Sequence, residues 1–257
     1  MCTLSLITRD SGYLLAMNRD EKIERGAGEL PESHLLRGIS VIQPNDGTAG
    51  TWIAVNSYGN SFALLNLNVA LPHGLDRTRM RSRGQIIPNL GTSSSLAEVQ
   101  NTAGVVDLGK TLPFRLVGVF PSEKAIGEWR WDSEKLGFQA HRWELQHWFS
   151  SSLSDKEAEN RRGAVCRDAQ HESDAGSIGW LRRLHASHAG GPGPFSLCVH
   201  RQDAATLSYS EVTCTPELVQ MTHLRGGPCT SVELNTIKIQ RTHCADAHAS
   251  TAGNLTI

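Results

Sequence analysis

Alternating apolar and polar positions dominate the first half of the chain and predict β-strands there. Residues 2–8 and 13–18 are apolar runs on either side of the turn sequence RDSG, a pattern typical of a hairpin. Four more strand-like runs follow, at 38–44, 51–56, 61–69 and 113–120. The breaks between the first three of these are rich in Asn, Asp and Gly, which tolerate positive φ. This spacing predicts consecutive antiparallel strands.

Helical patterns are fewer and shorter. We predict helices over 79–90, 95–102, 155–170 and 180–188. Ser154, ahead of the third, is a good N-cap, and the glycine and proline cluster at 190–194 ends the fourth. Strand-like runs return at 196–201, 205–213 and 218–223.

The order of these patterns indicates one α+β domain. No internal repeat or linker divides the chain, so we assign residues 1–240 to a single domain. From Arg241 the sequence is polar with weak periodicity, and we expect 241–257 to be a loosely attached tail.

Charge and hydropathy exclude several classes of partner. Lys plus Arg number 25 and Asp plus Glu 26 in 257 residues, a formal charge of -1, which gives no overall attraction to nucleic acid or an anionic membrane. No apolar run approaches the roughly 18 residues of a membrane span. The N-terminus also lacks the pattern of a signal peptide, so we expect a cytoplasmic protein. The distribution of apolar residues along the chain indicates no particular oligomeric state.

The cysteines and histidines show no recognised ligand spacing. The six cysteines lie far apart, which in a chain of this kind favours reduced thiols over a disulfide framework. Cys198 and Cys214 lie in strand-like runs and are expected to be buried as small apolar side chains. The eleven histidines, including His185, His188, His243 and His248, form no motif such as H-E-x-x-H, so we expect neither a metal nor a cofactor.

Cys2 is the exception among the cysteines because it directly follows the initiator methionine. Methionine aminopeptidase generally removes Met1 when the second residue is small. Cys2 would then carry a thiol, with an ordinary pKa of about 8.5, beside a free α-amine, with an ordinary pKa of about 7.7–8.0. The amine can therefore act as the base for the thiol.

A polar cluster, Asn18-Arg19-Asp20-Glu21, closes the predicted hairpin. The hairpin returns the chain to its start, so these side chains are expected near Cys2. Asp20 can hold the α-ammonium group or orient the thiol, and Arg19 can lower the thiol pKa and bind a substrate carboxylate. The alternative is a simple polar turn.

These residues, with four further motifs, resemble the NRDE family, which includes the Transport and Golgi Organisation proteins. The additional motifs are Arg25, Gly50-Thr51-Trp52-Ile53-Ala54-Val55-Asn56, Ala63-Leu64-Leu65-Asn66 and Ser82-Arg83-Gly84. The resemblance covers roughly the first ninety residues.

The resemblance implies an N-terminal-nucleophile (Ntn) hydrolase-like fold, a four-layer αββα sandwich of two antiparallel sheets. Relatives with an N-terminal cysteine cleave or transfer amide-linked acyl groups. By this resemblance Cys2 is the nucleophile, Arg19 and Asp20 support it, and Asn66 donates to the oxyanion. Such an amide donor contributes roughly 3–4 kcal/mol to the barrier. The residues expected to bind substrate are Asn18, Glu21, Arg25, Trp52 and Arg201.

Two departures from the family pattern leave two hypotheses open. Ala49 replaces the first Gly of the usual GGTW, and Ser151 stands where the family often has an Asn that would supply a second amide. The first hypothesis is a cysteine amidohydrolase or acyltransferase acting on a small acyl-amide. The second is a non-catalytic protein of the same fold that binds or moves a ligand such as a haem or lipid, as the resemblance to eukaryotic relatives suggests.

Overall fold

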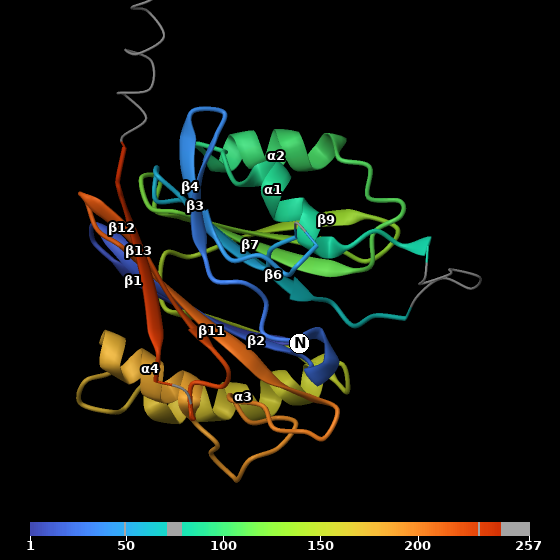
Figure 1. Ribbon diagram of the computed structural model, residues 1–257, viewed down its shortest axis with the longest axis vertical. Coiled ribbons are helices and arrows are strands. Elements are labelled where there is room, and N and C mark those ends of the chain that lie inside the picture. The colour runs from blue at the N-terminus through green and yellow to red at the C-terminus, as the bar shows by residue number, and fades with distance from the viewer. Residues whose placement is uncertain (49, 71–78, 231, 243–257) are drawn as a thin grey trace, which may run out of the picture.

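Two antiparallel sheets stack face to face, with helices on both outer surfaces (Figure 1). The computed structural model describes residues 1–48, 50–70, 79–230 and 232–242. One outer layer consists of α1 (Ile86–Leu90) and α2 (Leu96–Val105), and the other of α3 (Asp155–Ala169) and α4 (Ile178–Ala186). The predicted αββα sandwich is therefore confirmed.

The six-stranded sheet carries both ends of the described chain. Its order is β10-β1-β2-β11-β12-β13, so β1 lies inside the sheet rather than at an edge. The bounds are β1 (Cys2–Arg9), β2 (Gly12–Lys22), β10 (Gln146–Ser150), β11 (Ala204–Cys214), β12 (Leu218–Arg225) and β13 (Leu234–Gln240).

The seven-stranded sheet is a meander in which every strand pairs with its neighbour in sequence, from β3 to β9. The bounds are β3 (Glu32–Leu36), β4 (Ile39–Gln43), β5 (Ile53–Asn56), β6 (Ser61–Asn66), β7 (Phe114–Phe120), β8 (Ala125–Trp131) and β9 (Leu136–His141). Such consecutive pairing follows from short turns between antiparallel strands.

Three separate hydrophobic clusters fill the spaces between the four layers. One lies between the sheets and includes Leu4, Met17 and Ile53. A second lies under α1 and α2, and a third lies under α3 and α4. Each sheet is covered on both faces, and burial of apolar surface stabilises the fold by about 25 cal/mol per Å². This explains why apolar residues occur on both faces of the strands.

Side-chain alternation decides which residues of the N-terminal hairpin face which layer. Leu4 and Met17 belong to the cluster between the sheets, whereas Ile7 and Ala16 belong to the cluster under α3 and α4. Because successive side chains of a strand point to opposite faces, Cys2 shares the face of Leu4 and points between the sheets.

The segment 196–201 was predicted as a strand, and this was wrong. Its residues form turns, with a single isolated bridge between His200 and Ala205. The backbone of Cys198 donates to the carbonyl of Ser187 at 3.2 Å, and that of His200 donates to Gly193 at 3.2 Å. Its backbone groups therefore bond to loop residues and side chains rather than to a regular strand ladder.

Other element boundaries also differ from the predictions. The helix expected over 79–90 begins later, with a 3-10 turn at Arg83–Gln85 capped by Ser82, followed by α1. Five strands were not predicted from the sequence, namely β3, β8, β9, β10 and β13.

Of the expected tail, Arg241 and Thr242 are described, and both form hydrogen bonds to the rest of the domain: the backbone N–H of Thr242 donates to the carbonyl of Ser57 at 2.7 Å. Residues 243–257 lie outside the described part.

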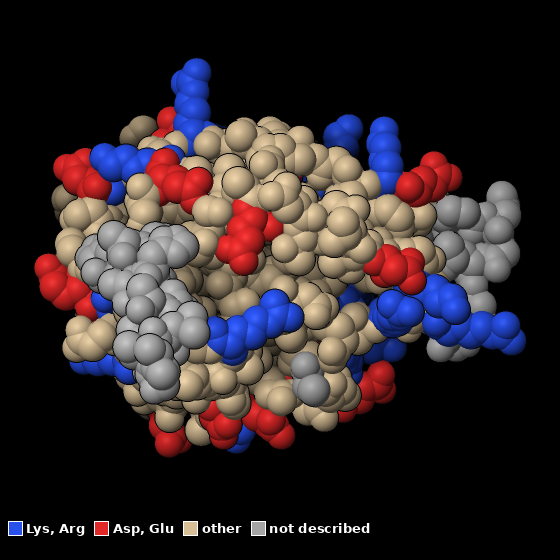
Figure 2. All heavy atoms as spheres, turned by 90° about the horizontal axis from the view of Figure 1, so that it is seen from above, with Lys and Arg blue, Asp and Glu red and all other residues tan. Residues whose placement is uncertain are grey.

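The surface carries both signs of charge. On the face in Figure 2, acidic and basic side chains alternate around the margin without a continuous patch of one sign. No described helix is both long and apolar enough to cross a membrane.

Candidate active site

The N-terminal hairpin places Cys2 directly opposite Arg19. The two are paired across β1 and β2, and on its other side Cys2 is paired with Ser150 of β10. Their shared position on the ladder turns both side chains toward the space between the sheets. Cys2 is only 6% exposed, so the thiol lies in a protected position at the end of an internal strand.

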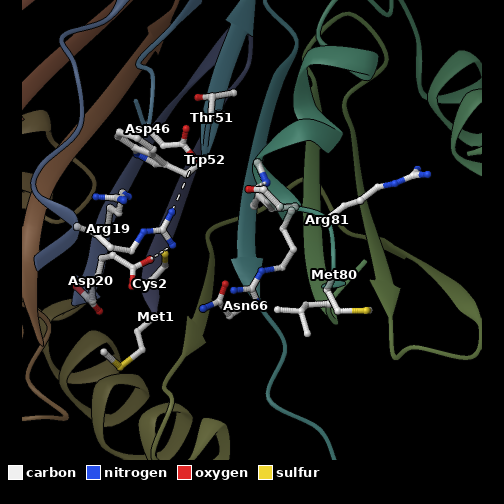
Figure 3. A pocket seen from close by; sticks show the side chains of 17 residues that line it. Met1, Cys2, Arg19, Asp20, Asp46, Thr51, Trp52, Asn66, Met80 and Arg81 are labelled. Carbon is white, nitrogen blue, oxygen red and sulfur yellow. Dashed lines mark hydrogen bonds and ion pairs between the residues drawn. The ribbon is translucent and has the colours of Figure 1, made fainter. Parts of the chain in front are cut away.

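A cavity of about 280 Å³ opens beside the thiol. Figure 3 shows Cys2, Arg19 and Asp20 on one wall and Asn66 on the other. The described lining consists of Met1, Cys2, Arg19, Asp20, Glu21, Arg25, Asp46, Thr51, Trp52, Leu64, Asn66, Met80, Arg81, Ser82, Arg83, Gly84 and Leu112. This set holds one thiol, three carboxylates and no histidine, and therefore does not resemble a transition-metal site.

Arg19 is held in place beside the thiol. Its Nη1 donates to the carbonyl of Gly26 at 3.0 Å, and its guanidinium lies 4.5 Å from the centre of the Trp52 ring. Burial lowers the pKa of Arg19, while Glu21 and Cys2 act in the opposite direction. Because an arginine starts from a pKa above 12, the side chain remains a cation facing Cys2.

Burial raises the pKa of the Cys2 thiol, and the charges of the N-terminal ammonium and of Arg19 only partly oppose this effect. The thiol is therefore protonated at neutral pH and requires a base to become a nucleophile. The described lining offers no imidazole for that role.

Asp20 contributes its backbone to the pocket but turns its carboxylate toward the helical layer. Thr206 Oγ1 donates to Asp20 Oδ1 at 2.7 Å, and Arg162 Nη1 lies 3.4 Å from Asp20 Oδ2. Burial raises the pKa of Asp20, with the charges of Arg162 and of the N-terminus acting against it. The carboxylate is thus a buried anchor behind Cys2 rather than a group that faces the cavity.

Arg162 is a site residue that the sequence reading missed. It is fully buried in α3, and its Nη1 donates to the carbonyl of Cys2 at 3.3 Å and to Thr3 Oγ1 at 2.9 Å. The signal was present: Ala158, Arg162 and Cys166 follow one another at intervals of four on the buried face of the helix. A charged residue within such an apolar stripe indicates a buried partner.

Met1 occupies part of the site in the unprocessed chain. The backbone N–H of Asp20 donates to the Met1 carbonyl at 3.0 Å. The Met1 sulfur lies 3.1 Å from Ser152 Oγ and 3.6 Å from Arg201 Nη1. Removal of Met1 would therefore free the α-amine of Cys2, enlarge the cavity and release the Asp20 N–H as a donor.

Asn66 and Trp52 supply donors from the opposite sheet. Asn66 is the last residue of β6, is half-buried, and has no hydrogen bond from its amide to another described side chain or backbone group. The Trp52 Nε1–H is buried and also lacks a partner among the described residues. Unpaired donors in a cavity are costly unless a ligand or water binds them.

The G-T-W and S-R-G motifs pack against each other. The backbone N–H of Thr51 donates to the Gly84 carbonyl at 3.1 Å. A Cβ at Gly84 would lie 3.1 Å from the Gly50 Cα and 3.2 Å from the Thr51 nitrogen. Glycine is therefore required for the close backbone approach that forms this wall.

We expect Gly84→Ala to lower the free energy of unfolding by about 1–3 kcal/mol, because the two nearest of the three atoms that it crowds belong to the backbone and the third is Asp46 Oδ2. Gly104→Ala, in α2, is the matched control: an added Cβ there meets nothing within 4 Å. It should be neutral or stabilise by up to about 1 kcal/mol. Urea unfolding of the two variants measures the difference, and equal stability would contradict the packing explanation.

Three residues proposed from the sequence stand away from the cavity. Asn18 is fully buried on the helical side, where its Nδ2 donates to the carbonyls of His185 at 2.9 Å and Leu197 at 2.8 Å. Arg201 pairs with Asp203 at 2.7 Å and is not itself part of the described lining, although its Nη1 lies 3.6 Å from the sulfur of Met1, which is. Ser151 is buried, and its backbone N–H donates to Asp155 Oδ1 at 2.6 Å at the start of α3.

Glu21, Arg25, Trp52 and Asn66 line the cavity. Arg25 bonds Glu21 at 3.1 Å and lies 3.9 Å from Asp46, so these three form the charged rim of the cavity. Trp52 and Asn66 line it from the second sheet. The structure therefore brings together Cys2, Arg19, the rim and the opposite wall.

A profile of the family described as Transport and Golgi organisation 2 matches residues 1–136. The chain belongs to this family. The matched part includes the whole N-terminal hairpin and the motifs that form the cavity wall. Among curated proteins, no sequence matches the chain.

Solved structures show the same fold at low sequence identity. Penicillin V acylase from Agrobacterium tumefaciens aligns over 93% of this chain and 86% of its own, with a TM-score of 0.53 and 10% identity. The Caenorhabditis elegans N-acylethanolamine-hydrolyzing acid amidase ortholog aligns over 82% of this chain and 92% of its own, with a TM-score of 0.56 and 7% identity. Both are proteins of the Ntn-hydrolase fold, so this member of the Transport and Golgi organisation 2 family is similar to them in architecture.

Proposed function

We propose that this protein is a cysteine amidohydrolase or acyltransferase that acts on a small acyl-amide through an acyl-enzyme at Cys2. The observation that carries the proposal is the placement of the N-terminal thiol, beside Arg19 and at the mouth of a polar cavity, on a fold shared with amidases.

The reaction uses the α-amine that follows Met1 removal. The amine accepts the thiol proton, and the Cys2 sulfur attacks the carbonyl carbon of the amide. The tetrahedral intermediate then expels the amine product, which takes up that proton, and leaves a thioester. Water, or an acceptor amine in the transferase reaction, is deprotonated by the α-amine and attacks the thioester, which releases the acid or new amide and restores the thiol.

Two donors fit the developing negative charge. The Asn66 amide faces the thiol from the opposite wall, and the Asp20 N–H, which bonds Met1 in the unprocessed chain, becomes available after its removal. One such donor is worth roughly 3–4 kcal/mol in the barrier. Arg19 adds positive charge nearby.

The lining favours a small polar substrate. Four arginines line the cavity, of which Arg19 and Arg25 lie on the thiol side. Arginine recognises carboxylates and phosphates through paired N–H donors, so an acyl-amide that bears an anionic group fits the site. A volume of about 280 Å³ lies at the lower end of small-molecule sites.

Intact mass spectrometry of the purified full-length chain tests the proposal. We expect the mass to lack Met1, iodoacetamide to modify Cys2 before the other thiols, and acid quenching with a panel of small acyl-amides to trap an acyl group on the Cys2 peptide. A chain that retains Met1 has a blocked amine and would refute this mechanism.

The second candidate is a binding protein without turnover, as the departure at Ser151 suggests. Asn66 is the one side-chain amide in the described lining, and Ser151, directly after β10, is not part of that lining. The charged and small cavity fits a large apolar macrocycle poorly. Binding of an acyl-amide that is retained in Cys2→Ala, without any acyl-enzyme in the native chain, would favour this candidate.

A further inference from the structure

A cluster of two thiols and two imidazoles lies outside the candidate active site, on the helical side of the six-stranded sheet. Each side chain offers one ligand atom, and the four atoms lie within 4.8 Å of one another. We call this set the thiol–imidazole cluster; its members are His188, Cys198, His200 and Cys229.

Two of the six distances within the cluster are near the edges of a coordination tetrahedron, and the 4.8 Å spread of the whole set requires a small inward shift on metal binding. The sulfurs of Cys198 and Cys229 are 3.4 Å apart, and the Cys229 sulfur lies 3.3 Å from His200 Nε2. Zn–S bonds of about 2.3 Å and Zn–N bonds of about 2.0–2.1 Å give tetrahedral edges of about 3.3–3.8 Å. The two sulfurs are also too far apart for a covalent disulfide, whose length is about 2.05 Å.

One of the ligand atoms has no other explanation. The Nε2 of His188 is buried and has no hydrogen-bond partner among the described residues. The ring centroids of His188 and His200 are 4.8 Å apart with an angle of 64° between the planes, so the two imidazoles meet edge to face rather than stacked. A buried nitrogen without a hydrogen-bond partner, on a ring beside two sulfurs and a second imidazole, fits a metal ligand.

The surrounding backbone leaves room for the sulfurs. A Cβ at Gly227 would lie 3.1 Å from the Cys198 sulfur and 3.5 Å from that of Cys229. Cys229 itself lies in a turn closed by the Thr230 N–H, which donates to the Gly227 carbonyl at 3.0 Å. The glycine therefore permits the two thiols to approach each other.

We propose that the thiol–imidazole cluster is a structural Zn²⁺ site. Binding replaces the two thiol protons, so that two thiolates neutralise the ion and the two imidazoles bind as neutral ligands, with no net charge left in the site. Four protein ligands leave no open position, which suits a structural rather than a catalytic ion.

The four residues are too far apart in the sequence for the site to be predicted from ligand motifs. Cys198 and Cys229 are 31 positions apart, and His188 follows α4 in a separate segment. The expectation of no metal rested on the absence of short ligand motifs, which these positions do not form. The fold joins them because β12 ends beside the turns at 196–201.

The ion would hold the segment that supports the active site. Val199 lies between two ligands, donates to Thr206 Oγ1 at 2.7 Å, and accepts from the Thr206 N–H at 3.0 Å. Thr206 in turn donates to Asp20, and the neighbouring Leu197 carbonyl accepts from Asn18. Zinc would thereby fix the backbone behind Cys2 without touching the substrate.

Metal analysis of the full-length protein, purified under reducing conditions, tests the site. We expect close to one zinc per chain by elemental analysis and by native mass spectrometry. Co²⁺ added to the metal-free chain should give the visible absorption of a tetrahedral ion and sulfur-to-cobalt charge-transfer bands. A strong zinc chelator should lower Tm by at least about 4 °C.

Matched variants assign the metal to this cluster. Cys229→Ser and His188→Ala should each reduce zinc at least tenfold and remove the chelator effect on Tm, whereas Cys166→Ser, Cys244→Ser and Cys2→Ala should keep the metal. Circular dichroism identifies any variant that fails to fold, and Co²⁺ spectra of the native chain do not depend on the variants. The proposal is overturned by a reduced native chain that binds neither metal, by zinc retained in Cys229→Ser, or by peptide mapping of a Cys198–Cys229 disulfide in the chain as isolated.

Discussion

Cys2→Ala is expected to abolish amide turnover, with a loss on the order of 10⁶-fold, as when the nucleophile of a serine protease is removed. The residual rate would come from binding and the oxyanion donors alone. The reason is the buried thiol, whose raised pKa makes its reaction depend on the adjacent amine. Stopped assays of product amine with a substrate found by acyl-enzyme trapping measure the loss.

An uncleaved N-terminal extension is the matched chemical control. It keeps the thiol but converts the α-amine to an amide, so it should lose nearly as much activity as Cys2→Ala. Cys166→Ala, which removes a buried thiol far from the cavity, should retain activity within about threefold, consistent with independent sites. Full activity in the extended protein would show that another base serves Cys2.

The N-terminal half of the site was predictable because local signals determine it. A turn after Arg9 and apolar alternation on both sides determine the hairpin register, and that register alone pairs Cys2 with Arg19. These inferences need only short-range pattern and strand periodicity. Asn66, by contrast, was proposed from the family resemblance, and the structure places it at the end of β6.

The orientation of Asn18 was wrong because a strand presents its neighbours to opposite faces. Arg19 faces the cavity, so Asn18 must face the helices, where it bonds two backbone carbonyls. The side chains of the four polar residues of the motif therefore alternate between the cavity side and the helical side of the sheet. Strict application of period-two alternation from Cys2 would have separated them.

Contacts across long sequence separations were not predictable. Arg162 reaches Cys2 over 160 positions, and the thiol–imidazole cluster assembles from three separate segments. Strand-like composition at 196–201 favoured a ladder, but local turns and the bonds to Thr206 prevailed. Tertiary packing decides such segments, and one sequence carries little information about it.

Arg162→Met is expected to lower the free energy of unfolding by about 3–5 kcal/mol, because it leaves the Asp20 carboxylate buried without its cation. The neighbouring Arg161→Met is the matched control on the same helix. Arg161 is exposed and pairs with Glu157 at the surface, so its loss should cost less than about 1 kcal/mol. Urea unfolding near pH 7 compares the two variants.

The pH dependence of the Arg162→Met deficit identifies the carboxylate as its cause. Burial already raises the pKa of Asp20 and Arg162 opposes that shift, so removing the guanidinium raises the pKa further. Folded Arg162→Met then holds a proton on Asp20 at pH values where the unfolded chain does not. The stability deficit should therefore shrink as the pH falls from about 7 to about 5.

The double variant Asp20→Asn/Arg162→Met should recover most of the lost stability, because it removes both charges from the interior. A double-mutant cycle gives the coupling energy, which we expect to exceed about 2 kcal/mol in favour of the pair. Additive effects, or a deficit independent of pH, would mean that Arg162 acts through its bonds to Cys2 and Thr3 instead. Asp20 adjoins the proposed nucleophile, so turnover is measured in the double variant as well. A double variant that regains stability but not turnover would show that the pair supports the reaction in addition to stabilising the fold.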